Sequence, residues 1–309
     1  MCTYAETPDV RLLLDAGVSL CPNRFGLSPH PEEFKVVDFS RRKILEAADK
    51  AEIVTLSHYH FDHHTPSFED WLCNWTERTE TARQIYEEKV VFMKNPREKI
   101  NYSQRRRAWM YQRTGGKFAQ KLDVADGKIF LFGQSTKVKF SEPVFHGPED
   151  SFLGWVLMTT IEYQAEKFMF APDVQGPMSS HTLGLILKEK PQLIMIGGPP
   201  LYLSGFKVKE EQIQIGLGNL GKVVETVPYT ILDHHILRDG NWREKARDVF
   251  QTARTHGHRI STAAEFLGNE NRLLEAERKR LFTEKPPSND FERWMRKTRS
   301  MKTHIRPPI

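Results

Sequence analysis

The chain has 309 residues, of which 39% are hydrophobic and 28% are charged, and a chain of this kind buries one large core or two modest ones. These values exclude a protein that is disordered throughout and a fibrous repeat. No apolar run approaches the roughly 18 to 20 residues that span a bilayer, and the first residues lack the features of a signal peptide. We therefore expect a cytoplasmic protein with no membrane partner.

The net charge of +5 is distributed unevenly along the chain. Residues 89–121 hold ten Lys or Arg and one acid, and residues 269–309 hold eleven Lys or Arg and six acids. Two basic segments on an otherwise neutral or acidic chain favour an anionic partner such as a nucleic acid, although charged runs are also common on solvated surfaces. The three cysteines are not paired closely enough for a thiolate zinc site or a disulfide framework.

The first elements predicted along the chain are a buried strand at residues 10–15, then a helix, and then a second strand at residues 53–57. Ser40 is the expected N-cap of the helix, because apolar residues follow it at helical spacing. Residues 67–121 are predicted to form a polar, basic, helical insert that lies outside the sheets.

Short apolar runs separated by Gly, Ser, Pro and Asp return after residue 128 and predict a second group of strands. These strands are expected at residues 129–132, 138–140, 154–161, 168–171, 193–196 and 229–232, and a helix at residues 242–256. Two groups of strands with helices outside predict an α+β fold in which two sheets pack together under outer helices. We expect a single domain over residues 1–268, followed by a basic helical tail over residues 269–309.

The densest chemical signal lies directly after the strand predicted at residues 53–57. Four of the twelve histidines fall within seven residues, together with an aspartate: His58, His60, Asp62, His63 and His64. Side chains alternate along an extended segment, so an extended start places His58 and His60 on the same side. Four imidazoles and a carboxylate are costly to bury without a metal ion, and such ligands suit zinc and other divalent first-row ions.

Further candidate ligands follow later predicted strands, and they are needed because one loop cannot complete two coordination spheres. His146 follows a short apolar pair, Asp173 follows the run at residues 168–171, and His234 and His235 follow the run at residues 229–232. Alternation along a continuing strand would turn His235 away from His234. We therefore prefer His234 as the ligand and place His235 behind it, or in the role of an alternative ligand.

The order of these residues resembles that of the metallo-β-lactamase superfamily. His58-x-His60-x-Asp62-His63 matches its H-x-H-x-D-H motif, and His146, Asp173 and His234 match its later histidine, bridging aspartate and final histidine. Residues 15–17, with the sequence Asp-Ala-Gly, look like the superfamily's first motif. More narrowly, residues 56–66, 146–148 and 232–239 resemble UPF0282, a mostly archaeal branch of predicted metal-dependent hydrolases, and this resemblance does not supply a substrate.

This resemblance implies a four-layer αββα sandwich that holds two divalent metal ions, with zinc expected first and manganese or iron as alternatives. The ligands that the resemblance implies are His58, His60 and His146 for one ion, Asp62, His63 and His234 for the other, and Asp173 between them. A hydroxide that bridges the ions would be the nucleophile, so no protein nucleophile is required. Asp62 is the expected catalytic group, because it can orient that water and take its proton.

The basic insert decides the preferred substrate. Residues 89–121 interleave aromatic residues with cations, a composition that binds phosphates and stacks on bases, so we favour a phosphodiester in a nucleotide or a nucleic acid. Arg105, Arg106 and Arg107 are the candidate substrate-binding residues, but on a helix they spread over about 200°, so only one or two are expected to matter. Two alternatives stay open: an acyl or thioester hydrolase of the glyoxalase type, and a non-catalytic metalloprotein that binds nucleic acid. The sequence leaves the oligomeric state open.

Overall fold

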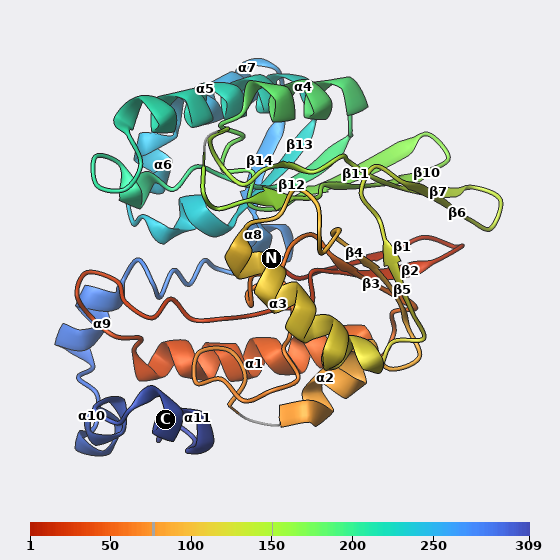
Figure 1. The fold of residues 1–309 in the computed structure, drawn as a ribbon. Coiled ribbons are helices and arrows are strands. Elements are labelled where there is room, and N and C mark those ends of the chain that lie inside the picture. Colours follow the sequence, from red (N-terminus) through yellow and green to blue (C-terminus); the bar gives the residue numbers. More distant parts are fainter. Residues whose placement is uncertain (76–77, 150) are drawn as a thin grey trace.

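The computed structural model describes residues 1–75, 78–149 and 151–309, which form four layers (Figure 1). Two β-sheets face each other in the middle, and helices cover the outer face of each sheet. This order of layers confirms the predicted α+β fold and its αββα sandwich. None of the helices in these ranges has the length and hydropathy of a membrane span.

The first sheet, as far as the described residues go, has five strands in the order β1-β2-β3-β4-β5. Their bounds are Thr3–Glu6 for β1, Arg11–Leu14 for β2, Ile53–Leu56 for β3, Val90–Met93 for β4 and Lys121–Val124 for β5. Strands β2 to β5 run parallel, so their carboxyl ends meet at one edge of the sheet. Strand β1 pairs antiparallel with β2, and the sequence patterns did not predict it.

The second sheet has seven strands within the described ranges, in the order β14-β13-β12-β11-β10-β7-β6. Their bounds are Ile129–Phe132 for β6, Thr136–Phe140 for β7, Thr159–Tyr163 for β10, Glu166–Ala171 for β11, Leu193–Gly197 for β12, Tyr229–Asp233 for β13 and Arg259–Thr262 for β14. Strands β11 to β14 run parallel, so β11 and β13 end at the same edge. A short hairpin of β8 (Val144–Phe145) and β9 (Trp155–Val156) lies apart from both sheets.

The central strands are buried on both faces. In β2, Leu12 and Leu14 pack between the sheets, whereas Leu13 packs under the helices that cover the first sheet. All three side chains are fully buried, and each contributes roughly 1.5–3 kcal/mol through removal from water. Two-sided burial explains why such a strand is a continuous apolar run in the sequence and does not alternate between polar and apolar residues.

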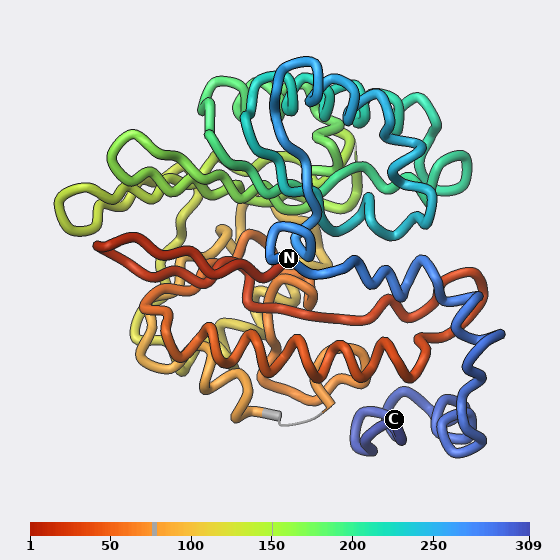
Figure 2. The backbone as a smooth tube through the Cα atoms, turned by 180° about the vertical axis from the view of Figure 1, so that it is seen from behind, coloured from red at the N-terminus to blue at the C-terminus, as the bar shows by residue number. Residues whose placement is uncertain are grey.

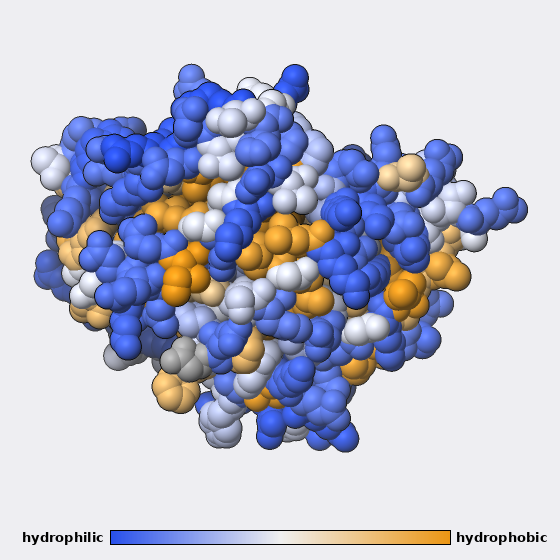
Figure 3. All heavy atoms as spheres, turned by 90° about the horizontal axis from the view of Figure 1, so that it is seen from above, coloured by the Kyte–Doolittle hydropathy of each residue, from blue (hydrophilic) through white to orange (hydrophobic). Residues whose placement is uncertain are grey.

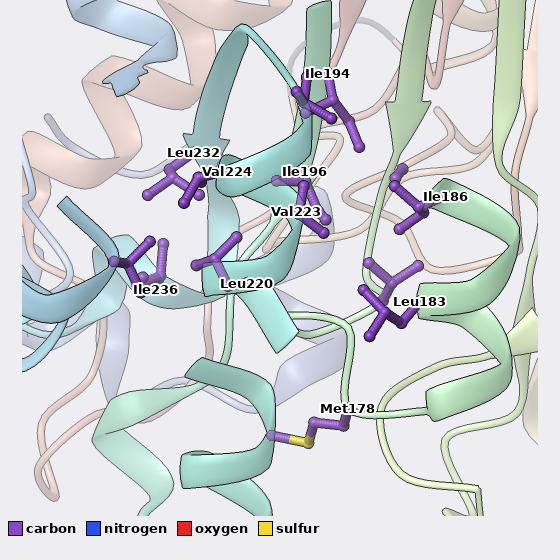
Figure 4. Packing of buried hydrophobic residues seen from close by; sticks show 14 of the residues in the cluster. Met178, Leu183, Ile186, Ile194, Ile196, Leu220, Val223, Val224, Leu232 and Ile236 are labelled. Atoms are coloured by element: carbon purple, nitrogen blue, oxygen red, sulfur yellow. The ribbon is translucent and has the colours of Figure 1, made fainter. Parts of the chain in front are cut away.

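Amphipathic helices complete the outer layers. Those over the first sheet are α1 (Pro31–Ala48), α2 (Arg78–Tyr86) and α3 (Tyr102–Arg113), and those over the second sheet are α4 (Ser180–Glu189), α5 (Glu210–Thr226) and α7 (Arg247–Thr255). Figure 4 shows Leu220 and Val223 of α5 packed with Ile196 of β12 and Leu232 of β13. The outer face of this layer is mostly hydrophilic, with apolar side chains gathered in a few patches near its middle (Figure 3).

Helix α1 begins earlier than predicted, at Pro31, and Ser40 is not its cap because Ser40 lies inside the helix. The His30 side chain caps the helix by accepting a hydrogen bond from the backbone N–H of Glu32. The Glu33 side chain accepts one from the backbone N–H of His30 in return. Proline suits the first helical position because the N–H that it lacks would have no partner in the helix.

Residues 67–121 are only partly the helical insert outside the sheets that was predicted. Helices α2 and α3 do lie in this segment, but Val90–Met93 forms β4 inside the first sheet, between β3 and β5. Three of its four residues are buried. The apolar run of β4 is short and lies among basic residues, so charge counted over the whole segment hides it. Residues 76 and 77 of the predicted insert lie outside the described ranges.

The C-terminal segment packs on the body of the protein. It contains the helices α9 (Arg278–Glu284), α10 (Asn289–Met295) and α11 (Arg299–His304). Phe291 and Trp294 of α10 contact Phe34 of α1 edge to face, and Arg278 forms a buried ion pair of 2.7 Å with Glu33. Figure 2 shows this segment beside the N-terminal part of the chain. The basic residues 269–309 are thus anchored to α1 by aromatic packing and a buried charge pair.

Candidate metal centre

The predicted ligands converge where strands of both sheets end. His58 follows β3, His146 follows β8, Asp173 follows β11 and His234 follows β13. Their side chains form overlapping groups in which the donor atoms lie within 4.8 Å of one another. The groups found among the described residues are His58, His60, His146 and Asp173; Asp15, His58 and His63; Asp62, His63 and His234; and Asp173, His234 and His235.

Asp173 lies at the centre of these groups. Its Oδ2 atom is 2.8 Å from Nε2 of His146, 3.2 Å from Nε2 of His58 and 3.3 Å from Nε2 of His63. Its Oδ1 atom is 3.0 Å from Nε2 of His234. The backbone of Asp173 has a φ of 47°, a left-handed conformation that aspartate tolerates better than most residues. This single carboxylate therefore faces both halves of the site.

The first half of the site consists of His58, His60 and His146. Nε2 of His58 lies 3.0 Å from Nδ1 of His60, and the ring centres of His60 and His146 are 5.2 Å apart. Burial lowers the pKa of His58 to about 4 and holds the pKa of His60 well below its usual value. Both imidazoles are therefore neutral near pH 7, and a neutral imidazole has the nitrogen lone pair that a divalent ion requires.

The second half consists of Asp62, His63 and His234. Oδ2 of Asp62 is 3.4 Å from Nε2 of His234 and 4.0 Å from Nε2 of His63. Burial opposes the charge of Asp62, but His63 and His234 outweigh it and hold the pKa of this carboxyl well below its usual range. Burial also opposes a proton on His63, yet Asp173 and Asp62 raise its pKa to about 10. This half of the site stabilises positive charge, as a cation-binding site must.

Asp15 determines which nitrogen atoms of two candidate ligands face the site. It accepts hydrogen bonds from Nδ1 of His63 at 2.7 Å and from the backbone N–H of Ser57 at 2.8 Å. The Ser57 hydroxyl donates to the same carboxylate, so its oxygen accepts from Nδ1 of His58 at 3.0 Å. In the neutral form both imidazoles therefore carry their proton on Nδ1 and direct Nε2 toward Asp173. The sequence marked Asp15 only as part of a motif, because its partners lie 42 and 48 residues away.

Gly17 lets the loop that carries His63 lie against the end of β2. A Cβ atom at this position would overlap the backbone of His63 and His64, so a larger residue would push the loop away. His64 itself is buried, with its ring edge to face against Tyr111, and its Nδ1 donates a hydrogen bond to the carbonyl of His60 at 2.9 Å. His64 belongs to none of the donor groups in the described part of the chain.

Several buried polar atoms of the site lack the partners that a metal ion would supply. Nε2 of His63, Nε2 of His234 and Oδ1 of Asp173 form no hydrogen bond with any residue that the structure describes. A buried polar atom left in this state costs roughly 1–3 kcal/mol. Imidazole nitrogens and carboxylate oxygens suit zinc and other divalent first-row ions. The donor set therefore fits a metal centre.

His234 and His235 both approach Asp173, because the strand does not continue past Asp233 and the alternation expected for a continuing strand does not apply. Strand β13 ends at Asp233, and His234 begins the 3-10 turn η3 (His234–Arg238) with a φ of 67°. The period of an extended strand no longer applies there. Nε2 of His235 is 3.5 Å from Oδ1 of Asp173, compared with 3.0 Å for Nε2 of His234. The choice of His234 as the ligand stays a prediction, and the shorter distance supports it.

The three arginines of α3 have different surroundings. Arg105 and Arg106 are exposed. Arg107 is half-buried, and its guanidinium lies 4.9 Å from the centre of the Phe61 ring, next to Asp62 in the sequence. The structure therefore brings one of the three predicted substrate-binding residues to the loop of the metal centre and leaves the other two on the surface.

A further cation and a cavity lie beside the second half of the site. Nη2 of Arg238 is 3.7 Å from Oδ2 of Asp62, and Nε of Arg238 is 3.5 Å from Oε2 of Glu275. A cavity of about 350 Å³ opens next to His234 and Arg238, and aliphatic side chains such as Val37 supply much of its lining. Neither Arg238 nor Glu275 was singled out from the sequence, because their contacts join segments that are far apart in the chain.

Archaeal proteins match nearly the whole chain, although no family model matches it. The UPF0282 protein of Methanopyrus kandleri is 42% identical over 287 residues, which cover 91% of this chain and 94% of the relative. The UPF0282 protein of Methanocaldococcus jannaschii is 41% identical over 282 residues, which cover 91% of each chain.

Similarity to solved structures is weaker. Zn²⁺-bound PqqB from Methylobacterium extorquens has a TM-score of 0.46 at 9% identity and covers 84% of each chain. Tm1679, a metal-dependent hydrolase of the β-lactamase superfamily, has a TM-score of 0.44 at 12% identity, over 82% of this chain and 85% of that one. The four layers and the candidate ligands at the strand ends agree with the resemblance to the metallo-β-lactamase superfamily. The identity to the archaeal relatives shows that the chain belongs to the UPF0282 family.

Proposed function

We propose that this chain is a metal-dependent hydrolase with two divalent ions, zinc in the first place and manganese or iron as alternatives. The observation that carries the proposal is the position of Asp173, whose carboxylate lies within 3.3 Å of histidine nitrogens from both halves of the site. The residues that would hold the ions are His58, His60 and His146 on one side, Asp62, His63 and His234 on the other, and Asp173 between them. Bound ions would lower the pKa of water and stabilise the charge that builds up on the substrate.

Asp62 is the carboxylate best placed to act on water. Its side chain is 27% exposed to solvent, whereas that of Asp173 is 1% exposed. Solvent therefore reaches Asp62 while its Oδ2 atom stays 3.4 Å from Nε2 of His234. A carboxylate in this position can hold a water molecule for attack and accept its proton.

The preferred substrate is a phosphodiester, in a nucleotide or a nucleic acid. Two cations next to Asp62 support this choice: Arg238, at 3.7 Å from its carboxylate, and Arg107, which stacks on the neighbouring Phe61. Both positive charges would attract a phosphate, and the planar guanidinium of Arg107 would match its oxygens with paired donors. Arg105 and Arg106 lie further out on the same helix, where a longer polyanion would pass them.

An acyl or thioester substrate is the second candidate, and the cavity beside His234 favours it. Its aliphatic lining would suit an acyl chain better than a base or a sugar. In that case Arg238, which also lines the cavity, would bind the polar end of the substrate.

Elemental analysis of the purified chain, followed by a substrate panel at the same metal loading, tests the proposal. Close to two ions per chain, with cleavage of phosphodiesters and strongly salt-dependent binding, would support it. Turnover of small esters or thioesters with little effect of salt would favour the acyl alternative. Binding of oligonucleotides without turnover would indicate a non-catalytic metalloprotein, and a chain that binds no divalent ion would contradict the whole proposal.

A further inference from the structure

The ring of His235 is held from behind by a donor, Arg238, and by the hydroxyl of Tyr202, whereas the ring of His63 is held by an acceptor, Asp15. Nη1 of Arg238 lies 3.4 Å from Nδ1 of His235, with its N–H directed at the nitrogen, and the hydroxyl of Tyr202 lies 3.3 Å from the same atom. In His63, by contrast, Nδ1 meets the carboxylate of Asp15 at 2.7 Å. The two imidazoles therefore have partners of opposite hydrogen-bonding character.

The character of the partner decides where His235 carries its proton. A guanidinium has donors only, so Nδ1 of His235 must accept the hydrogen bond from Arg238. A proton on Nδ1 would point at the N–H of Arg238, whereas the hydroxyl of Tyr202 can donate to Nδ1 once that nitrogen is an acceptor. The proton therefore lies on Nε2, which is 3.5 Å from Oδ1 of Asp173. A protonated Nε2 has no lone pair left for a metal ion.

We propose that His235 is a catalytic hydrogen-bond donor, whose Nε2–H binds an oxygen of the substrate, and that it is not a metal ligand. This inference rests on the proposed hydrolase function and deepens it. Nε2 of His235 is buried and has no hydrogen-bond partner among the described residues. It also lies within 4.8 Å of the donor atoms of Asp173 and His234, which places it at the centre of the site. The matching ligand is a tetrahedral oxyanion such as a phosphoryl group.

A donor held in place before the reaction stabilises charge as it develops on the substrate oxygen. Hydrogen bonding by Nε2–H moves no proton to the substrate, so His235 stays neutral throughout. Such donors act strongly in a site from which water is partly excluded. The side chain of His235 is only 12% exposed, so its surroundings exclude most of the water.

Arg238 is a positioning residue for His235, and carboxylates hold it on two sides. Its Nε lies 3.5 Å from Glu275 and its Nη2 lies 3.7 Å from Asp62, while Nη1 remains for His235. Arg24 pairs with the same Glu275 and lies 3.8 Å above the ring of Tyr202. The orientation of His235 thus depends on the C-terminal segment, through Glu275.

Long-range ¹H–¹⁵N NMR of the zinc-loaded chain reads the tautomer directly. The signals of His235 are assigned as those that vanish in His235→Asn. We expect Nε2 to carry the proton and Nδ1 to be the acceptor, in both the zinc-loaded and the zinc-free chain. A metal-bound Nε2, or a proton on Nδ1, would overturn the inference.

Metal content and phosphate binding provide an independent test. His235→Asn should keep the zinc content of the wild type but bind inorganic phosphate on the order of tenfold more weakly when zinc-loaded, because a hydrogen bond to a charged oxygen is lost. His234→Asn should lose zinc. His256→Asn, at an exposed histidine, is the matched control and should change neither quantity. Loss of zinc in His235→Asn, or unchanged phosphate affinity, would count against the donor role.

Variants of the supporting residues separate positioning from folding. Arg238→Met should let a proton appear on Nδ1 of His235 without loss of zinc. If Arg238→Met does not fold, Tyr202→Phe removes the other hydrogen-bonding partner of Nδ1 and should shift the tautomer in the same direction to a smaller degree. An unchanged tautomer in the variant that folds would overturn the positioning role. A wild-type chain that binds no zinc would contradict the proposed function instead, and the zinc-free spectrum would still decide the tautomer.

Discussion

Two regions of the site, the loop with His63 and the turn with His235, each direct an imidazole toward the carboxylate of Asp173. The residues that hold the two rings from behind differ. Asp15 accepts a hydrogen bond from Nδ1 of His63, whereas Arg238 donates one to Nδ1 of His235. An acceptor behind the ring leaves the inner nitrogen free to bind a cation. A donor behind the ring leaves a proton on the inner nitrogen. The role of an imidazole in this site therefore follows from the residue behind it.

Replacing Asp173, which both regions share, should have the largest effect. Asp173→Ala removes the carboxylate that faces both donor groups, so metal content should fall from close to two ions to at most one, and activity should fall with it. Elemental analysis and turnover at fixed metal loading measure both quantities. The control is Asp248→Ala, whose side chain is 96% exposed. An Asp173→Ala chain that retains two ions would remove the bridging role.

The next largest effect on zinc binding is expected when Asp15, which holds the ring of His63, is replaced. Asp15→Ala leaves the N–H groups of Ser57 and His63 without an acceptor, which should lower the free energy of unfolding by about 3 kcal/mol. Zinc affinity should fall by roughly 10- to 100-fold, because His63 loses its orientation. Urea unfolding and competition with a chelator measure these changes. Equal losses of zinc affinity in Asp15→Ala and Arg238→Met would erase the distinction between the two regions.

Replacing Asp62 tests whether metal binding and turnover can be separated within the second half of the site. Asp62→Asn keeps an oxygen ligand but removes the proton acceptor, so turnover should fall by roughly 10²- to 10⁴-fold while total metal falls much less. The ratio of turnover to bound metal is the quantity to measure. A fully active Asp62→Asn variant would exclude Asp62 as the catalytic group.

The smallest effect is expected when arginines of α3 are replaced. This helix carries three consecutive arginines, so a partly buried one can be compared with two exposed ones. Arg107→Gln should flatten the salt dependence of oligonucleotide binding by about one unit for the lost phosphate contact, with metal content unchanged. Arg105→Gln and Arg106→Gln are the matched controls, since both side chains are exposed and should change the slope less. Identical slopes in the wild type and in a variant with all three replaced would remove the arginines from the choice of substrate. The acyl alternative would then stand equal to the phosphodiester.

Strand ends and clustered histidines could be predicted from the sequence because both depend on near neighbours. The run at residues 53–57 and the histidines after it lie within twelve residues of the chain, and β3 does end at Leu56. The later ligands follow the apolar runs that form β11 and β13. Strand β4 was missed because its short apolar run lies within a basic segment, and only its place in the sheet separates it from the helices around it.

The sequence by itself determined the layers of the fold and the identity of the candidate ligands, since apolar periodicity and local residue density require no distant contacts. Only the tertiary structure decided which residues hold each candidate ligand in place. Asp15 reaches His63 across 48 residues, and Glu275 holds Arg238 from the C-terminal segment. Turn η3 also brings His235 beside His234, where an extended strand would separate them. Such hydrogen-bond partners come together only after the sheets have packed, so no local pattern in the chain records them.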